Sequence, residues 1–305
     1  MELLKNLADV SKEEQRKFIE SFDHVLADMD GVIWLTNKMF PFSVECMNSL
    51  KQRGKTIRYA TNNPLVNVVD LWKKLVREGF NAEIADVVNP LLSVMSYLKS
   101  INFNKKLYVI GSEKFKEELR KENFKLASDP PQVVEESVPV VLKYISDDED
   151  IGAVIFSWDL NMTFIKLQKV LTYLKRKDCL FIAVANDKKA PIGPPGPLIG
   201  TGDFIGMVSD FSGREPTFIG KPSAYFAQFV NQKFDIVDPK RALFIGDQID
   251  PDMKFGSTGG YQKLLVLSGI AKIEDIKNWK HPEEYKPEYY IESLDVLNDI
   301  LKSIK

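Results

Sequence analysis

Short apolar runs alternate with amphipathic stretches along almost the whole chain. The runs at 24–29 and 55–61 have the length and composition of strands, and the stretch at 64–79 has helical spacing. Its apolar residues fall on one helical face and are Leu65, Val68, Val69, Trp72, Leu75 and Val76. Strand, helix, strand and helix in this order predict βαβ units and a parallel sheet.

Polar and glycine residues predict where two of these helices begin and end. Ser43 suits the N-cap of the helix between the two strands, and Gly54 suits its C-terminal end. Gly79 ends the second helix.

The same alternation continues to the end of the chain. Further strands are expected at 106–111, 152–158, 179–186, 216–220, 241–247, 263–269 and 289–291. Further helices are expected at 112–123, 162–177, 223–232 and 293–304. The stretch at 185–202 is so rich in proline and glycine that no regular element is expected there. A loop of this length favours a functional role, such as a wall over a binding site.

Composition adds limits rather than a function. The 305 residues carry a net charge of −2 and are 44% hydrophobic, which fits one large or two ordinary folded domains. This balance gives no strong attraction to nucleic acid or to a membrane surface, and no run of about 18 apolar residues predicts a membrane span. Cys46 and Cys179 lie in apolar contexts and are expected to be free, buried thiols, so we expect a cytoplasmic protein.

The first candidate for chemistry is the pair Asp28 and Asp30, which ends the first strand. Residues two apart in a strand point to the same side, and Gly31 permits a sharp turn after them. Both carboxylates should therefore converge at the carboxyl end of a parallel strand, where open α/β sheets bind ligands. Two adjacent carboxylates favour a hard cation such as Mg²⁺. The alternative is an ordinary Asp-Gly turn.

The second candidate follows the next strand. Thr61, Asn62 and Asn63 offer a hydroxyl and turn N–H groups, which together can cradle a phosphate. The alternative is an Asx turn that leads into the following helix.

The third candidate is Lys221, which lies between a strand and a helix that starts near Pro222. There its ammonium group can lie beside a phosphoryl group. A P-loop is excluded because Pro222 stands where Ser or Thr is required and Glu215 where Gly is required. Taken alone, a solvated lysine is the simpler interpretation.

The fourth candidate is Asp247, again at the end of a strand, with Asp250 and Asp252 shortly after it. This density of acids suits a metal, although the spacing does not meet the EF-hand pattern. The alternative is that Asp250 or Asp252 caps a helix.

Taken together and in this order, the four motifs resemble those of the haloacid dehalogenase superfamily of phosphohydrolases. "DMDGVIW", "TNN", "IGKPS" and "GDQIDPDMKFG" resemble most closely the 4-nitrophenyl phosphatase branch, which includes phosphoglycolate and pyridoxal phosphate phosphatases. The resemblance implies a doubly wound parallel-sheet α/β core at 1–93 and 205–305, with an inserted α/β cap domain at 94–204. Two departures affect the expected substrate more than the chemistry: Pro64 follows "TNN", and "VANDKKAPIG" keeps only part of a T-N-x-D element of the cap.

The resemblance also implies a role for each motif. Asp28 would be the nucleophile and Asp30 the general acid and base, and both would bind Mg²⁺ together with Asp247, Asp30 through its backbone carbonyl. Phosphate would be bound by Thr61, Asn62, Asn63 and Lys221. Asp252 would orient Lys221 or a water molecule on the metal. The partner would be a small-molecule phosphomonoester, and the cap would mediate a homodimer.

Other functions stay open at this stage. The same motifs could serve a catalytically inactive phosphate-binding scaffold, or a phosphotransferase that shares the aspartyl-phosphate step. A nucleotide-dependent oxidoreductase is disfavoured because no G-x-G-x-x-G follows the first strand. Contacts to the leaving group are expected from the aromatic residues at 156–164 and from the loop at 186–203, while Phe156 and Phe164 are expected to pack in the core of the cap.

Overall fold

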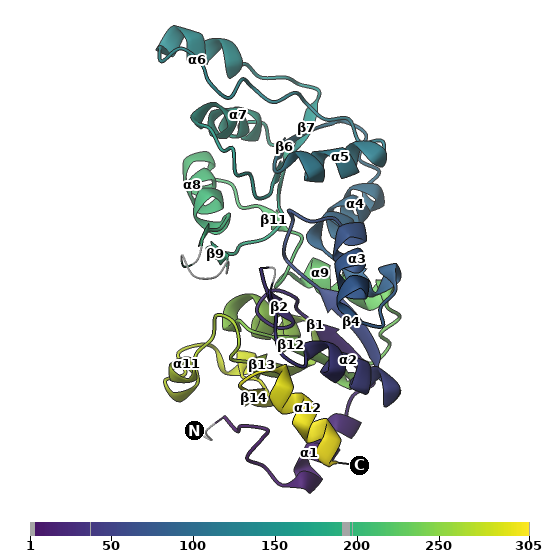
Figure 1. Ribbon diagram of the computed structural model, residues 1–305. Helices are drawn as coiled ribbons and strands as arrows, with labels where there is room; N and C mark the ends of the chain where they lie inside the picture. The colour runs from purple at the N-terminus through teal and green to yellow at the C-terminus, as the bar shows by residue number, and fades with distance from the viewer. Residues whose placement is uncertain (1–3, 37, 191–195, 197, 305) are drawn as a thin grey trace.

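The computed structural model describes residues 4–36, 38–190, 196 and 198–304, and it contains two separate parallel sheets, one in each half of the molecule (Figure 1). The strands of the larger sheet are β1 (His24–Ala27), β4 (Thr56–Ala60), β5 (Val87–Val88), β12 (Ala242–Gly246), β13 (Gln262–Val266) and β14 (Tyr289–Ile291). Their order across the sheet is β14-β13-β12-β1-β4-β5, and all the pairings are parallel. The predicted parallel α/β fold is therefore confirmed.

Helices cover both faces of the larger sheet. On one face lie α1 (Lys12–Glu20), α2 (Ser43–Gln52), α3 (Val68–Glu78) and α12 (Leu294–Ser303). On the other lie α9 (Ala224–Lys233), α10 (Lys254–Gly259) and α11 (Ile273–Lys277). Within β1, Val25 packs into the first layer and Leu26 into the second. Burial on both faces explains why these strands read as continuous apolar runs rather than alternating ones.

The smaller sheet has the same layered construction. Its strands are β6 (Lys106–Ile110), β7 (Ile151–Phe156), β8 (Leu180–Ala183) and β11 (Thr217–Phe218), all parallel, in the order β11-β8-β7-β6. One face packs against α4 (Pro90–Ser100) and α5 (Glu113–Lys121), the other against α7 (Phe164–Leu174) and α8 (Gly202–Ser212). A further helix, α6 (Val138–Tyr144), lies at the end of the molecule farthest from the larger sheet (Figure 1).

Two short antiparallel hairpins complete the strands. They are formed by β2 (Trp34–Leu35) with β3 (Lys38–Met39), and by β9 (Lys189–Ala190) with β10 (Leu198–Ile199). The second hairpin lies inside the stretch at 185–202, so the expectation that this stretch holds no regular element was wrong. All four of its prolines lie outside the described residues.

The helix ends correct some of the capping predictions. Phe42, in the left-handed region with φ 58°, precedes α2, and Ser43 is its first helical residue. Asn67 caps α3 because its side chain accepts a hydrogen bond from the N–H of Asp70. Consequently α3 begins three residues later than the apolar spacing suggests, and it ends as predicted at Gly79, which has φ 101°.

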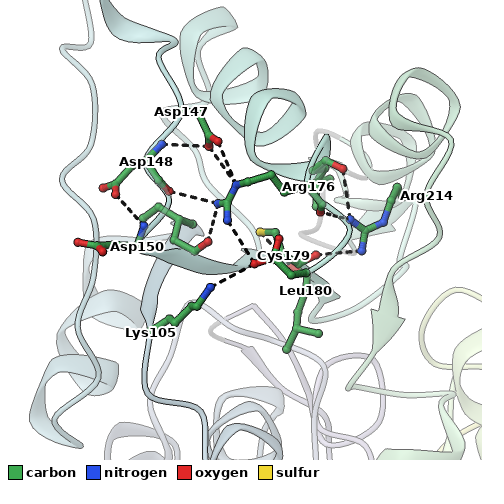
Figure 2. Close-up of polar contacts among 11 residues, drawn as sticks. Lys105, Asp147, Asp148, Asp150, Arg176, Cys179, Leu180 and Arg214 are labelled. Atoms are coloured by element: carbon green, nitrogen blue, oxygen red, sulfur yellow. Dashed lines mark hydrogen bonds and ion pairs between the residues drawn. The ribbon is translucent and has the colours of Figure 1, made fainter.

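Arg176 and Arg214 hydrogen-bond the backbone at one edge of the smaller sheet, opposite the carboxyl ends of its strands (Figure 2). The guanidinium group of Arg214 donates hydrogen bonds to three backbone carbonyl oxygens, including that of Cys179 at 2.9 Å. Arg176 pairs with Asp147 at 3.1 Å and donates to the carbonyl of Ile151 at 2.6 Å.

The cysteine prediction is confirmed, because Cys46 and Cys179 are free and buried.

Among the described residues, no helix is long and apolar enough to cross a membrane.

Candidate active site

We call the six-stranded sheet with its helices the larger domain, and the four-stranded sheet with its helices the smaller domain. A cavity of about 550 Å³ lies between them. Its walls come from segments that follow β1, β4 and β12 in the larger domain and β7 and β8 in the smaller one. The residues that the sequence predicted for this site and that line the cavity are Asp28, Asp30, Thr61, Asn62, Asn63, Lys221 and Asp252. Four motifs that are remote along the chain therefore meet at one place: three follow β1, β4 and β12 of the larger sheet, as expected for the carboxyl ends of a parallel sheet, and Lys221 follows β11 of the smaller sheet.

Asp28 and Asp30 both lie at the end of β1 and line the cavity. Asp28 is buried, and its Oδ1 accepts a hydrogen bond from the N–H of Met29 at 2.8 Å. The carboxylate of Asp30 accepts hydrogen bonds from Trp34 Nε1 at 3.0 Å and from Asn63 Nδ2 at 3.4 Å. Burial raises the pKa of Asp28 to about 8 and also raises the pKa of Asp30. For Asp30, a raised pKa favours the protonated form, which a general acid needs.

Lys221 is the buried cation of the site. Its Nζ lies 3.0 Å from Asp28 Oδ1 and 2.8 Å from Asp252 Oδ1, and 2% of the residue is exposed. Burial lowers the pKa of Lys221, but the nearby carboxylates of Asp252 and Asp28 outweigh this and raise it. The solvated lysine considered from the sequence alone is therefore excluded.

Asp247 follows β12 and lies behind Asp28. Its Oδ2 accepts a hydrogen bond from the N–H of Ile270 at 2.8 Å, whereas its buried Oδ1 has no hydrogen-bond partner. Two glycines permit this close packing, since a Cβ atom would lie 2.3 Å from Asp247 Oδ2 at Gly31 and 1.8 Å from it at Gly269. Burial, followed by the charges of Asp252 and Asp28, raises the pKa of Asp247 well above its usual range.

These carboxylates fit a divalent cation. Asp28, Asp247 and Asp252 are buried, and each offers an oxygen atom within 4.8 Å of the others. Lys221 is the buried cation among them, so their negative charge is only partly balanced. An oxygen donor without a hydrogen-bond partner, in a cluster of carboxylates, is the chemistry that Mg²⁺ and other hard cations prefer. Asp28 and Asp247 are the residues that could hold it.

Asp252 supports the other acidic residues. Its Oδ2 accepts hydrogen bonds from the N–H groups of Asp247 and Gln248, both at 3.1 Å, and its Oδ1 pairs with Lys221. Asp252 lies inside a π-helical turn, Ile249–Met253, whose N-cap is Gln248. The alternative in which Asp250 or Asp252 is the helix N-cap was therefore wrong, and Asp250 is an exposed residue outside the site.

The Thr-Asn-Asn segment combines both interpretations considered from the sequence. Thr61 Oγ1 accepts from the N–H of Asn63 at 3.0 Å, and Asn63 Oδ1 accepts from the N–H of Leu65 at 3.0 Å, as in an Asx turn. The side-chain amide of Asn62 is engaged by the backbone of Lys221 at both its oxygen and its nitrogen. Any contact between Asn62 and a phosphate would therefore come from its backbone N–H group.

The smaller domain supplies wall residues that sequence reasoning located only by region. Trp158 and Leu160 follow β7, and Asp187, Lys189 and Leu198 come from the predicted loop at 186–203. Both predicted regions therefore contribute to the cavity.

Two of the aromatic residues considered for that wall have other environments. The prediction that Phe156 is a core residue is confirmed, but the same prediction for Phe164 was wrong, because 69% of Phe164 is exposed.

Asp187 and Lys74 are two charged residues of the cavity that the sequence analysis did not single out. Burial raises the pKa of Asp187 to about 6, and Asp187 Oδ2 accepts a hydrogen bond from Asn62 Nδ2 at 3.0 Å. Lys74 extends from α3, with its Nζ 3.8 Å from the centroid of the Trp34 ring. A lone acid in a loop and a lysine on an amphipathic helix carry no sequence signal of their own.

Comparison with known proteins gives consistent similarities over nearly the whole chain. A family profile described as haloacid dehalogenase-like hydrolase matches residues 25–125, and a second, described as HAD-hydrolase-like, matches residues 218–297. Phosphoglycolate phosphatase 1A, chloroplastic, of Arabidopsis thaliana is 30% identical over 291 residues, which cover 93% of this chain and 78% of the relative.

Two further comparisons agree in extent. Glycerol-3-phosphate phosphatase of Mus musculus is 26% identical over 298 residues, which cover 93% of this chain and 92% of the relative. The crystal structure of 4-nitrophenylphosphatase from Thermotoga maritima has the same fold, with a TM-score of 0.77 at 22% identity, over 94% of this chain and 99% of that one.

Proposed function

Because the chain belongs to the haloacid dehalogenase-like hydrolases, in the branch of the 4-nitrophenyl and phosphoglycolate phosphatases, we propose that it is a Mg²⁺-dependent phosphomonoesterase that acts through an aspartyl-phosphate on Asp28. The observation that carries the proposal is the meeting of Asp28, Lys221 and Asp247, of which Asp28 and Lys221 line the cavity and Asp247 packs beside Asp28. Phosphoryl transfer requires mainly positioning and electrostatic stabilisation, and this group of residues supplies both.

The reaction has two halves that use the same residues. In the first, a carboxylate oxygen of Asp28 attacks phosphorus, the bond from phosphorus to the ester oxygen breaks, and Asp30 gives its proton to the leaving alcohol. In the second, Asp30 takes a proton from water as that water attacks phosphorus, and the bond between phosphorus and Asp28 breaks. The raised pKa of Asp30 supports its role as the acid of the first half.

The remaining residues stabilise charge on the phosphoryl group. Lys221 balances it from a buried position, and the hydroxyl of Thr61 and the backbone N–H group of Asn62 donate to its oxygens. Asn63 supports them, since its own N–H donates to Thr61 Oγ1. Asp252 holds the Lys221 ammonium group in place. Asp28, Asp247 and the backbone carbonyl of Asp30 would hold Mg²⁺, which would supply positive charge against the transferred group.

The substrate is a small-molecule phosphomonoester. In support of this class, the relatives are named as phosphatases of glycerol 3-phosphate, phosphoglycolate and 4-nitrophenyl phosphate. The cavity also extends past the phosphate end to Trp158 and Leu198, which leaves room for an alcohol larger than glycolate. A cytoplasmic homodimer joined through the smaller domain is part of the same proposal.

An inactive scaffold and a phosphotransferase are the competing functions. An inactive scaffold has no need for a second carboxyl group, Asp30, with a raised pKa beside Asp28, and an open site would serve a phosphotransferase acceptor better than a cavity between two domains. The test is release of inorganic phosphate from 4-nitrophenyl phosphate by the purified protein, with Mg²⁺ and with a chelator. Mg²⁺-dependent release supports the proposal. No release in Mg²⁺, or full release in the chelator, contradicts it.

A further inference from the structure

The smaller domain presents one acidic side chain to the larger domain from a tightly built segment. Around Asp187, the backbone carbonyl oxygens of three residues accept hydrogen bonds from the stretch that follows β10. Thr201 Oγ1 donates to Ala185 at 3.0 Å, the N–H of Gly202 donates to Asp187 at 3.1 Å, and the N–H of Gly200 donates to Lys188 at 2.9 Å. The position of Asp187 is therefore fixed by its own domain.

Close packing confirms that this segment has little freedom. A Cβ atom at Gly200 would lie 1.9 Å from the carbonyl oxygen of Asp187, and one at Gly220 would lie 2.2 Å from that of Val184. Such distances cannot be accommodated without moving the backbone. Displacement of the Asp187 backbone away from Asn62 thus requires a shift of the segment together with its domain.

The carboxylate of Asp187 contacts the larger domain at Asn62. Asp187 Oδ2 accepts a hydrogen bond from Asn62 Nδ2 at 3.0 Å. The same side-chain amide holds the backbone of Lys221, since Asn62 Nδ2 donates to the carbonyl of Lys221 at 3.0 Å and Asn62 Oδ1 accepts from its N–H at 2.9 Å. One amide group therefore joins the smaller domain to the residue whose ammonium group lies 3.0 Å from Asp28.

We propose that Asp187 is a positioning residue, an inference that rests on the proposed function. Through Asn62, it couples docking of the smaller domain to the orientation of Lys221. The two N–H bonds of the Asn62 amide are both used when Asp187 is in place. When the smaller domain moves away, Asn62 loses one of its acceptors and the backbone of Lys221 loses part of its support. Lys221 is then fully oriented only when the cavity is covered and water is excluded.

An acidic side chain is better suited to this positioning role than to direct binding of the phosphoryl group. A carboxylate repels a phosphate dianion, whereas as an acceptor from an amide it forms a hydrogen bond of the stronger, charge-assisted kind. Lys221 lies close enough to lower the pKa of Asp187, although burial dominates.

The test compares Asp187→Ala with Asp187→Asn, and uses Asp203→Ala as the matched control. Asp203 is an exposed acid of the same domain whose partner is Lys188 at 3.6 Å, with no contact to Asn62. Asp187→Ala should lower kcat for 4-nitrophenyl phosphate about 30-fold, with KM changed less than about 3-fold, because the lost contact acts on the transition state. Asp187→Asn keeps an oxygen acceptor for Asn62 and should stay within about 3-fold of the unmodified protein, as should Asp203→Ala.

A double-mutant cycle with Asn62→Ala shows whether the effect passes through Asn62. In that background Asp187→Ala should cost less than about 3-fold, because the shared contact is already lost. The inference is overturned if Asp187→Ala costs the same factor in both backgrounds, if it has no effect on the unmodified protein, or if Asp187→Asn is as impaired as Asp187→Ala.

The failure of this inference can be told from failure of the proposed function. If the unmodified protein releases no phosphate with Mg²⁺, the proposed function itself is wrong. If it does release phosphate and the variants behave in one of the contradicting ways, only the role of Asp187 is wrong.

Discussion

Asp28 is the residue on which the chemistry depends, and its surroundings explain why its neighbours are acidic. It lies between Lys221 and the cluster formed with Asp247 and Asp252. Burial raises the pKa of Asp28 and of Asp247, and the neighbouring carboxylates raise both further. The site therefore contributes least to the free energy of unfolding when its carboxylates are ionised, which is the state that binds a metal.

The first prediction concerns the nucleophile. Asp28→Asn should lower kcat by at least about 10³-fold, because an amide cannot form the aspartyl-phosphate. The melting temperature without metal should stay the same or rise, since the variant removes a buried charge. Phosphate release and thermal unfolding measured on the same preparation check both parts. Retention of a tenth of the activity would rule Asp28 out as the nucleophile.

The second prediction concerns pH. The folded protein binds the proton of Asp28 more tightly than the unfolded chain does, because the pKa is raised from 3.8 to about 8. The resulting stabilisation is complete below about pH 4 and is lost as the pH rises through about 8. In a chelator, the melting temperature should therefore fall more steeply between about pH 5 and about pH 8 than it does in Asp28→Asn.

The control for this prediction is Asp250→Asn, which removes an exposed carboxylate just outside the site. It should show the same pH dependence as the unmodified protein. Mg²⁺ should raise the melting temperature more at pH 8 than at pH 5, because protons compete for its ligands. Equal shifts at both values would contradict the metal assignment.

At the scale of single elements, the sequence predicted the strand ends well and the loops less well. Asp28, Thr61 and Asp247 follow β1, β4 and β12 of the larger sheet, so parallel-sheet geometry was enough to bring these three together. Lys221 follows β11 of the smaller sheet, and that geometry alone does not place it beside Asp28. Asp187 was missed because its role depends on a contact with Asn62, which is 125 positions away in the chain. The four residues of β9 and β10 are too few for a periodic pattern, so their pairing could not be foreseen.

The third prediction tests an element remote from the cavity. Arg214→Ala should lower the free energy of unfolding by about 2 kcal/mol, since three backbone carbonyls lose a charged donor. It should change kcat for 4-nitrophenyl phosphate less than about 3-fold, because the arginine does not line the cavity. Arg120→Ala is the control, as its pair with Glu113 is exposed and should contribute at most about 0.5 kcal/mol. Chemical denaturation measures both, and equal losses would contradict the prediction.

At the scale of the whole molecule, the inserted domain is the part that the resemblance outlined and the sequence pattern alone did not. The boundaries at 94 and 204 stay a prediction. Helix α8 packs against the smaller sheet, and β11 pairs with β8 inside it. We therefore propose that the chain returns to the larger domain after β11. The helix α4 at the other crossing also packs against that sheet.

The fourth prediction concerns assembly. Phe164 and Phe211, on α7 and α8, are 69% and 78% exposed, so the outer face of the smaller domain carries large apolar side chains. If the homodimer forms there, Phe211→Asp should convert it to a monomer in light scattering. Val237→Asp changes an apolar side chain that is 94% exposed elsewhere and should leave the dimer intact. A monomeric unmodified protein, or a Phe211→Asp dimer, would contradict this.

The most direct test of the account is to trap the phosphorylated enzyme during turnover. Borohydride added to the protein with Mg²⁺ and 4-nitrophenyl phosphate reduces an aspartyl-phosphate, and peptide mass spectrometry then locates the modified residue. The account predicts conversion of Asp28 to homoserine, only when substrate and Mg²⁺ are both present. Modification at another residue, or none in a preparation that is turning over substrate, would contradict it.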